Sequence, residues 1–425
     1  MKTSYYNYIL EQGRYSYWYN GVTHFFFRLP IELGNKLKGY LADSFSFNAI
    51  PATFYQKLLE GGFIISDEAD ELDLIRKKNR ETVNDKNYFL TILPTLNCNF
   101  ECWYCIQEHI PSRMSATTIE QIKRHIDHMI DQEGITSLTI EWFGGEPFIY
   151  FHQVIRPICE YAQSRCAKNN IPYMTSATTN GFFLNPPLLE HLKKLQFKRF
   201  HITLDGPKKN HDKVKYQKNC SSAFDRVLQN IDFILKNTED IFFLLRVNYT
   251  EENLDPIIVQ DINQIITPEN RSRIRITPKK VWQENVQKER SVKIIELMNI
   301  FEQAGYQVTY LDIIENFVPC YTNRKYYNTI NYNGDVLKCT ACNDLYEKKI
   351  HGMLNSDGTI SWDKDFLKRY EAVSFENNRC LSCKYLPICM GICPRDYDRG
   401  GYCKYDGIDT NITEAIIAHI DSSYC

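Results

Sequence analysis

The sequence lacks the features that would assign it to a membrane, secreted or nucleic-acid-binding class. No uninterrupted apolar stretch approaches twenty residues, and no apolar segment of the kind that directs secretion opens the chain. A large excess of one charge is also absent, because 50 Lys and Arg are matched by 52 Asp and Glu, without long blocks of either sign. We therefore expect a cytoplasmic protein that neither spans a membrane nor binds nucleic acid.

Cysteine is absent from residues 1–80 but abundant further along the chain. The 425 residues contain 15 cysteines. In a chain without a secretion signal, this number favours a reducing compartment, in which thiolates bind metal rather than form disulfides. The length predicts two or three domains.

Three cysteines form a C-x3-C-x2-C triplet just after an apolar, strand-like segment: Cys98, Cys102 and Cys105. Three thiolates on one short loop can hold three irons of a cubane iron–sulfur cluster and leave the fourth iron open to a small molecule. A zinc knuckle or a set of structural thiols is the alternative, but zinc sites usually pair C-x2-C units with a second pair of Cys or His ligands. Here the triplet has no local fourth ligand, and Tyr104 directly precedes the last cysteine.

The triplet resembles the signature of the radical S-adenosylmethionine (SAM) enzymes. The resemblance implies that the open iron chelates SAM, that the three cysteines are catalytic and that Tyr104 stacks on the adenine. Cleavage of SAM would then give a 5′-deoxyadenosyl radical, which abstracts hydrogen from an unactivated carbon. The electron would come from a reductant such as flavodoxin or ferredoxin.

A second motif, Phe143-Gly144-Gly145-Glu146-Pro147, follows the next strand-like segment about forty residues later. The two glycines let the backbone approach a ligand closely, and Glu146 can accept hydrogen bonds from an ammonium group. Taken alone, the motif is also a common turn. Together with the cysteine triplet, it resembles the segment that holds the SAM amino group, and the resemblance assigns Gly144, Gly145, Glu146 and Pro147 to cofactor binding.

Polar residues end three further strand-like segments. Thr179 and Asn180 carry a hydroxyl and an amide that suit the ribose of SAM, as the resemblance implies. Asp205 lies in a Thr-x-Asp-Gly-Pro stretch similar to that of cofactor- and peptide-modifying members, and we expect it to contact SAM or substrate; residues 211–212 beyond it also fit a plain helix start. Arg246 can pair with the SAM carboxylate or form an ordinary salt bridge.

Eight more cysteines crowd the interval from Cys320 to Cys403. Their spacing resembles that of the SPASM domain, a cap with two auxiliary [4Fe-4S] clusters, and a zinc ribbon is the alternative. The resemblance implies an inner cluster held by Cys320, Cys339 and Cys393, and a distal cluster held by Cys380, Cys383, Cys389 and Cys403. Cys342 can complete the inner shell or be a buried thiol. With the first triplet, the chain would bind three [4Fe-4S] clusters and SAM.

The pattern of strand-like and helical segments in the first 85 residues predicts a small separate module. Residues 5–10 and 15–19 read as a β-hairpin, two short helices follow near 30–41 and 51–59, and a charged, helical linker covers 67–83. Small strands with short helices suggest a winged-helix-like module, similar to the leader-peptide recognition element of enzymes that modify ribosomal peptides. A structural cap is the alternative.

Strand-like and helical segments alternate from residue 88 to 310, which predicts an α/β fold with a parallel sheet. The resemblance implies a partial (β/α)6 radical SAM barrel whose active site lies at the carboxyl ends of the strands. We expect three domains: the N-terminal module (1–85), the barrel (86–310) and a cysteine-rich SPASM cap (311–425).

The resemblance implies a radical SAM/SPASM peptide maturase that abstracts hydrogen from a ribosomally made precursor peptide with a leader and installs a crosslink or similar modification. Anaerobic sulfatase-maturating enzymes are related, but their catalytic aspartate would fall at Thr340, which counts against that activity. A non-catalytic iron–sulfur electron-transfer or peptide-binding protein is the alternative from another class. Such a protein is expected to lose the triplet or the Gly-Gly-Glu-Pro segment, and both are intact.

Overall fold

The computed structural model describes residues 1–42, 44–250, 252–281, 283, 290–308, 320–340, 351–371, 377–391 and 409–424. The chain forms two compact units. The first comprises Met1–Asp85, Tyr310–Lys325 and Lys368–Cys425, and the second comprises Lys86–Thr309 and Tyr326–Leu367. The three-domain division stays a prediction, and residues 1–85 share their unit with segments from the last third of the chain.

The second unit is built on a mixed sheet, which has eleven strands in the described residues, in the order β12-β11-β10-β9-β8-β7-β6-β13-β14-β15-β16. The strands are β6 (Asn87–Ile92), β7 (Ser137–Trp142), β8 (Tyr173–Thr179), β9 (Phe197–Leu204), β10 (Phe242–Tyr249), β11 (Ile274–Lys280), β12 (Gln307–Val308), β13 (Tyr327–Ile330), β14 (Asp335–Leu337), β15 (Gly352–Leu354) and β16 (Ile360–Trp362). Neighbours from β12 to β13 pair in parallel, whereas β13 to β16 pair antiparallel. The predicted α/β class is confirmed.

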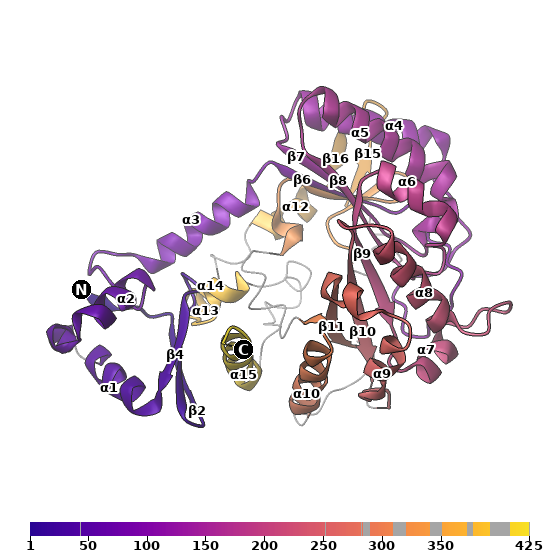
Figure 1. Ribbon diagram of the computed structural model, residues 1–425. Helices are drawn as coiled ribbons and strands as arrows, with labels where there is room; N and C mark the ends of the chain where they lie inside the picture. Colours follow the sequence, from indigo (N-terminus) through magenta and orange to yellow (C-terminus); the bar gives the residue numbers. More distant parts are fainter. Residues whose placement is uncertain are drawn as a thin grey trace. The chain divides into compact units, whose positions relative to one another are not determined.

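Helices follow most of the parallel strands and lie along the sheet (Figure 1). They are α4 (Ala116–Asp131), α5 (Arg156–Lys168), α6 (Leu189–Lys194), α7 (Lys208–Val214), α8 (Ala223–Lys236), α9 (Ile257–Asn263) and α10 (Arg290–Gln303), and α12 (Lys364–Glu371) follows β16. The serines before α4 and α8 cap these helices, because Ser115 accepts a hydrogen bond from the Thr118 N–H and Ser222 from the Asp225 N–H.

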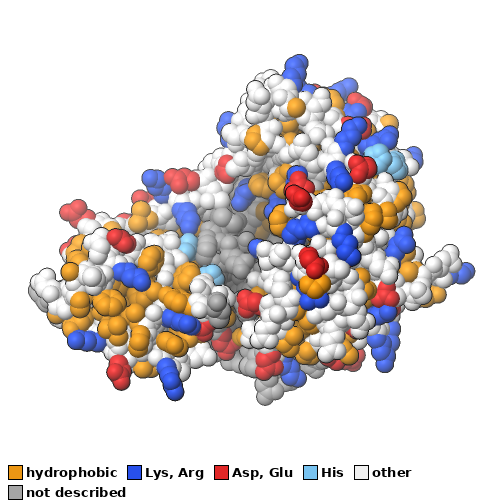
Figure 2. Space-filling model, viewed as in Figure 1, with side chains coloured by type: hydrophobic (Ala, Val, Ile, Leu, Met, Phe, Trp, Pro, Cys, Tyr) orange, Lys and Arg blue, Asp and Glu red, His pale blue; other side chains and the backbone are white. Residues whose placement is uncertain are grey.

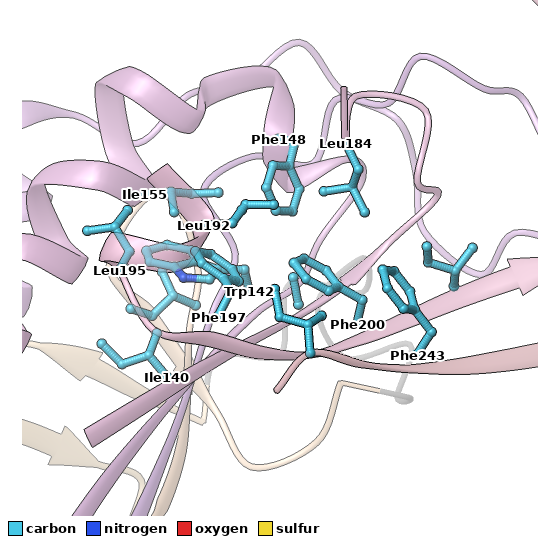
Figure 3. Packing of buried hydrophobic residues seen from close by; sticks show 14 of the residues in the cluster. Ile140, Trp142, Phe148, Ile155, Leu184, Leu192, Leu195, Phe197, Phe200 and Phe243 are labelled. Atoms are coloured by element: carbon cyan, nitrogen blue, oxygen red, sulfur yellow. The ribbon is translucent and has the colours of Figure 1, made fainter. Parts of the chain in front are cut away.

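Large apolar side chains fill the space between the sheet and its helices. Trp142 of β7, Phe197 and Phe200 of β9, and Phe243 of β10 meet Phe148 and side chains from the helical side (Figure 3). All five are buried. Because burial of apolar area is the main stabilising contribution to a fold, this cluster fixes how the strands and helices stack.

The other face of the same strands carries polar residues. Successive side chains of a strand point to opposite faces, so Glu141, His201 and Arg246, each one position away from a core residue, lie on the face away from the core cluster. Thr178 and Asn248 continue this pattern on β8 and β10. The polar face therefore leads toward the carboxyl ends of the strands, where the predicted site residues lie.

The first unit contains a three-stranded antiparallel sheet in the order β2-β3-β4. Its elements are β1 (Lys2–Thr3), β2 (Asn7–Gln12), β3 (Tyr15–Asn20), β4 (Phe26–Pro30), α1 (Ile31–Leu41), α2 (Ala52–Glu60), β5 (Ile64–Ile65), α3 (Glu71–Val83), α13 (Asn378–Leu381), α14 (Leu386–Cys389) and α15 (Asp409–Ser422). The predicted hairpin is confirmed as β2 and β3. Strand β4 was not predicted. The winged-helix-like description of this module stays a prediction.

Both faces of this small sheet are covered. Trp18 and Phe27 point into a core that includes residues of α1 and α2. Tyr17 and Tyr19 belong to a second core together with Ile416 and other isoleucines of α15. Residues from the two ends of the chain therefore form one folded unit.

Acidic and basic side chains are interspersed on the face of the molecule that Figure 2 shows, in line with the formal net charge of −2. Among the described residues, no helix combines the length and the apolar character that a membrane span requires.

Candidate active site at the strand ends

The cysteine triplet lies on a long loop between β6 and α4, here called the cysteine loop (residues 93–115). Its two ends are tied together near the sheet, because the Thr95 hydroxyl donates to the Ser112 carbonyl oxygen (2.6 Å) and the Met114 N–H donates to the Pro94 oxygen (2.9 Å). Cys98 and Cys102 are half-buried, whereas Cys105 is exposed. The loop thus carries the three thiols above the carboxyl end of β6.

The glycine pair after β7 supports the backbone next to Cys98. A Cβ atom on Gly144, whose φ is +116°, would lie 2.4 Å from the Thr95 carbonyl oxygen, and one on Gly145 would lie 2.2 Å from the Asn97 oxygen. Only glycine permits this approach. This close approach allows two backbone hydrogen bonds: the Gly145 N–H donates to the Thr95 oxygen (3.2 Å), and the Glu146 N–H donates to the Asn97 oxygen (2.8 Å).

The Glu146 carboxylate joins the end of β7 to the end of β8. It is fully buried, and it accepts hydrogen bonds from the Thr179 hydroxyl (2.8 Å) and from the N–H groups of Phe148 (3.0 Å) and Asn180 (2.8 Å). Burial raises the pKa of Glu146 to about 7. Both carboxylate oxygens accept hydrogen bonds from the chain itself, so this residue fixes the geometry of the predicted ribose-binding pair Thr179 and Asn180.

Asn180 in turn contacts the cysteine loop. Its side-chain amide donates to the Asn99 Oδ1 (2.7 Å) and lies 3.9 Å from the Cys98 sulfur. The predicted residues Cys98, Gly145, Glu146, Thr179 and Asn180 are therefore brought together by direct contacts. Pro147, which begins the turn after Glu146, is buried.

A second group of contacts surrounds Asp205, which follows β9. The Tyr104 hydroxyl donates to the Asp205 Oδ1 (2.5 Å), and the Asn248 amide lies 3.4 Å from the same oxygen. On its other side, the Asp205 Oδ2 lies 3.2 Å from the Lys215 Nζ. Asp205 and Lys215 are buried, and the Asp205 N–H donates to the His211 Nδ1 (3.2 Å).

Tyr104 is therefore held by an anion. Burial and the adjacent Asp205 charge raise the pKa of the Tyr104 hydroxyl, so it remains a proton donor. Lys215 was not identified from the sequence as a residue of the site, although it comes four residues after His211, in a stretch that resembles a family motif. The site contact expected of Asp205 stays a prediction.

Arg246, on β10, is half-buried, and this burial lowers its pKa. Its Nε has no hydrogen-bond partner, and none of the ion pairs found between described residues involves it. An ordinary salt bridge therefore has no support in the described part of the chain. The guanidinium lies close enough to the Asp205 carboxylate for the two charges to attract each other.

Known proteins resemble this chain in sequence and in fold. Residues 92–258 match the model of the Radical SAM superfamily. This segment of the chain is a radical SAM domain. The chain is 23% identical over 385 residues to the radical SAM cyclopropyl synthase TigE of Paramaledivibacter caminithermalis, which covers 83% of this chain and 77% of TigE.

Two solved structures have a similar fold. The structure of anSMEcpe with bound AdoMet and Cp18Cys peptide has a TM-score of 0.56 at 16% identity and covers 79% of this chain and 98% of anSMEcpe. Streptococcus suis SuiB bound to the precursor peptide SuiA has a TM-score of 0.52 at 16% identity and covers 94% of this chain and 96% of SuiB. At 16% identity, these likenesses show a shared fold.

The cysteines beyond the radical SAM domain are only partly described. Cys320, Cys380, Cys383 and Cys389 belong to the first unit, and Cys339 is buried in the second. Cys342, Cys393 and Cys403 lie outside the described residues. The two auxiliary clusters and the SPASM cap therefore stay predictions.

Proposed function

We propose that the chain is a radical SAM peptide maturase, which abstracts hydrogen from a side chain of a ribosomally made precursor peptide and installs a crosslink or a similar modification. The observation that carries this proposal is the convergence of the cysteine loop with Gly145, Glu146 and Asp205. The cysteine loop follows β6, Gly145 and Glu146 follow β7, and Asp205 follows β9. They all lie at the carboxyl ends of parallel strands, where open α/β folds bind their ligands.

The cysteine loop fits a four-iron cluster better than a single metal ion. In the described residues, no three Cys, His, Asp or Glu side chains converge on a point that one ion could occupy. A cubane cluster does not require such convergence, because each thiolate binds a different iron. When bound, the cluster and SAM supply an electron and a 5′-deoxyadenosyl radical.

The contribution of the protein is to orient SAM and the target carbon and to exclude water from the reactive site. The glycine pair holds the backbone that carries Cys98, and Glu146 holds the ends of β7 and β8 in register. Arg246, whose Nε has no partner in the described residues, is suited to the SAM carboxylate. Tyr104, fixed through its hydroxyl, presents its ring for the adenine.

A peptide substrate is supported by the relatives. TigE is named a cyclopropyl synthase, and SuiB was solved with its precursor peptide SuiA. Since the SuiB match covers 94% of this chain, most of residues 1–85 fall within it. We propose on this basis that residues 1–85 belong to the part that recognises the leader of the precursor.

The test uses the anaerobically reconstituted protein with a reductant, SAM and a candidate precursor, chosen from short open reading frames beside the gene. We expect 5′-deoxyadenosine formation, and a peptide that loses two hydrogens for each crosslink formed. A precursor that remains unmodified while free amino acids or small metabolites are turned over would contradict the peptide assignment.

Leader recognition needs a test that leaves the first unit intact, because residues 1–85 share a core with α15. We expect the leader alone, added in trans, to compete with the full precursor and slow its modification. The core peptide without its leader is the control and should compete weakly. Equal competition by the two peptides would show that the leader is not recognised.

A further inference from the structure

A buried lysine lies beside the cysteine loop and is not part of the proposed SAM contacts. Lys215 follows α7 and is 3% exposed. Its ammonium lies 3.2 Å from the Asp205 Oδ2 and donates to the Thr203 carbonyl oxygen. Burying an ammonium group costs free energy unless its charge and its N–H groups find partners. Asp205 and the Thr203 oxygen supply these partners for Lys215.

Two chains of contacts connect this segment to the cysteine loop. Through Asp205, Lys215 reaches the hydroxyl of Tyr104, which lies between the second and third cysteines. Two residues further along, the Gln217 side chain donates to the Asn99 carbonyl oxygen, between the first and second cysteines. Residues 215–217 therefore connect both halves of the cysteine loop to the strand ends of the sheet.

The charge of Lys215 lies next to the cysteine loop, because its partner Asp205 accepts a hydrogen bond from the hydroxyl of Tyr104, the residue directly before Cys105. Asp205 contributes the opposite charge on this side of the loop, so the thiols face a paired cation and anion rather than either charge alone.

We infer that Lys215 is a positioning residue for the predicted iron–sulfur site: its ammonium holds Asp205 against Tyr104, and its charge favours the electron that the site must accept. Gln217 fixes the other half of the loop. The inference rests on the proposed function, since only a redox-active site has a reduction potential to tune. A cation near such a site stabilises its more negative, reduced form and so raises its potential.

The test measures the midpoint potential by a redox titration monitored by electron paramagnetic resonance, following the signal that changes when SAM is added. Lys215→Met keeps the aliphatic chain and removes the charge, and it should shift this potential to more negative values. Lys215→Arg should stay near the wild-type potential. Lys213→Met is the matched control, because Lys213 is an exposed residue of α7, and it should leave the potential unchanged.

Asp205→Asn gives an independent check that does not depend on the folding of Lys215→Met. It keeps an oxygen that can accept from Tyr104 but removes the negative charge, so the potential should shift in the positive direction. The double variant Asp205→Asn/Lys215→Met should return toward the wild-type value. An Asp205→Asn shift that is absent or negative would overturn the electrostatic inference. A wild-type protein without a SAM-responsive signal would instead contradict the proposed function.

Discussion

Gly145→Ala is the sharpest single perturbation of the cysteine loop. The new Cβ would lie 2.2 Å from the Asn97 oxygen and 2.6 Å from the Leu96 oxygen. Both atoms belong to the backbone, so no side-chain rotation can relieve the clash, and the segment before Cys98 must move. Forcing an extra methyl into a packed site costs about 1–3 kcal/mol. Losing the hydrogen bond from the Glu146 N–H to the Asn97 oxygen adds about 1 kcal/mol.

We therefore expect Gly145→Ala to lower the free energy of unfolding by about 2–4 kcal/mol, as measured by anaerobic chemical denaturation. A displacement of the cluster ligands by about 1 Å should reduce 5′-deoxyadenosine formation on the order of 100-fold. Gly39→Ala is the matched control. Apart from its chain neighbours and the backbone of α1 itself, no atom of the described residues lies within 4 Å of the new Cβ, and a helical Gly→Ala change should stabilise by about 1 kcal/mol. Wild-type stability and SAM cleavage in Gly145→Ala would refute the proposed role of the glycine pair.

Three further predictions concern buried groups. Burial raises the pKa of Glu146 from 4.5 to about 7, so the stability that its protonated form contributes is complete below pH 4.5 and is lost as the pH rises through 7. This change amounts to about 3 kcal/mol of unfolding free energy. Glu146→Gln should flatten this part of the pH–stability profile of the metal-free protein, and a flat wild-type profile would contradict the pKa shift. Tyr104→Phe removes the hydroxyl that donates to Asp205 at 2.5 Å. It should lower the unfolding free energy by about 1–3 kcal/mol and weaken SAM binding, as measured by equilibrium dialysis. If stability and SAM binding both stayed unchanged, the contact would be ruled out. Ile416→Ala, in the core shared by α15 and the N-terminal sheet, should lower the free energy of unfolding by about 2–5 kcal/mol. Leu74→Ala, at an exposed position, is the control and should change it by no more than about 0.5 kcal/mol. Equal effects would show that this core does not stabilise the unit.

The alternation of strands and helices was predictable because strand-like and helical patterns of apolar residues follow one another along the chain. Strand β4 was not, for a physical reason. Phe26 and Phe27 both face apolar partners, one toward the core with α15 and the other toward the core with α1 and α2. The polar–apolar alternation that marks a half-buried strand is therefore missing. The helix that covers the second face comes almost 400 residues later in the chain, and no local pattern shows that pairing.

The site shows the same division between local motifs and distant contacts. The cysteine triplet and the glycine pair were recognisable, because their chemistry depends on spacing along the chain. Lys215 and Gln217 were not, since a lysine in a stretch with several other lysines is normally a solvated surface residue. Only the fold shows that Lys215 is buried against Asp205. It also shows that the carboxylate of Glu146, which is expected to bind the SAM amino group, accepts hydrogen bonds from Thr179 and Asn180.

The most direct test of the central claim is the iron content and SAM cleavage of the triple variant Cys98→Ala/Cys102→Ala/Cys105→Ala. Cys220→Ala, at a half-buried thiol outside the predicted cluster ligands, is the matched control and should behave like the wild type. We expect the triple variant to lose about four irons per chain and all 5′-deoxyadenosine formation. Retained SAM cleavage in the triple variant would contradict the assignment of the cysteine loop as the radical SAM site.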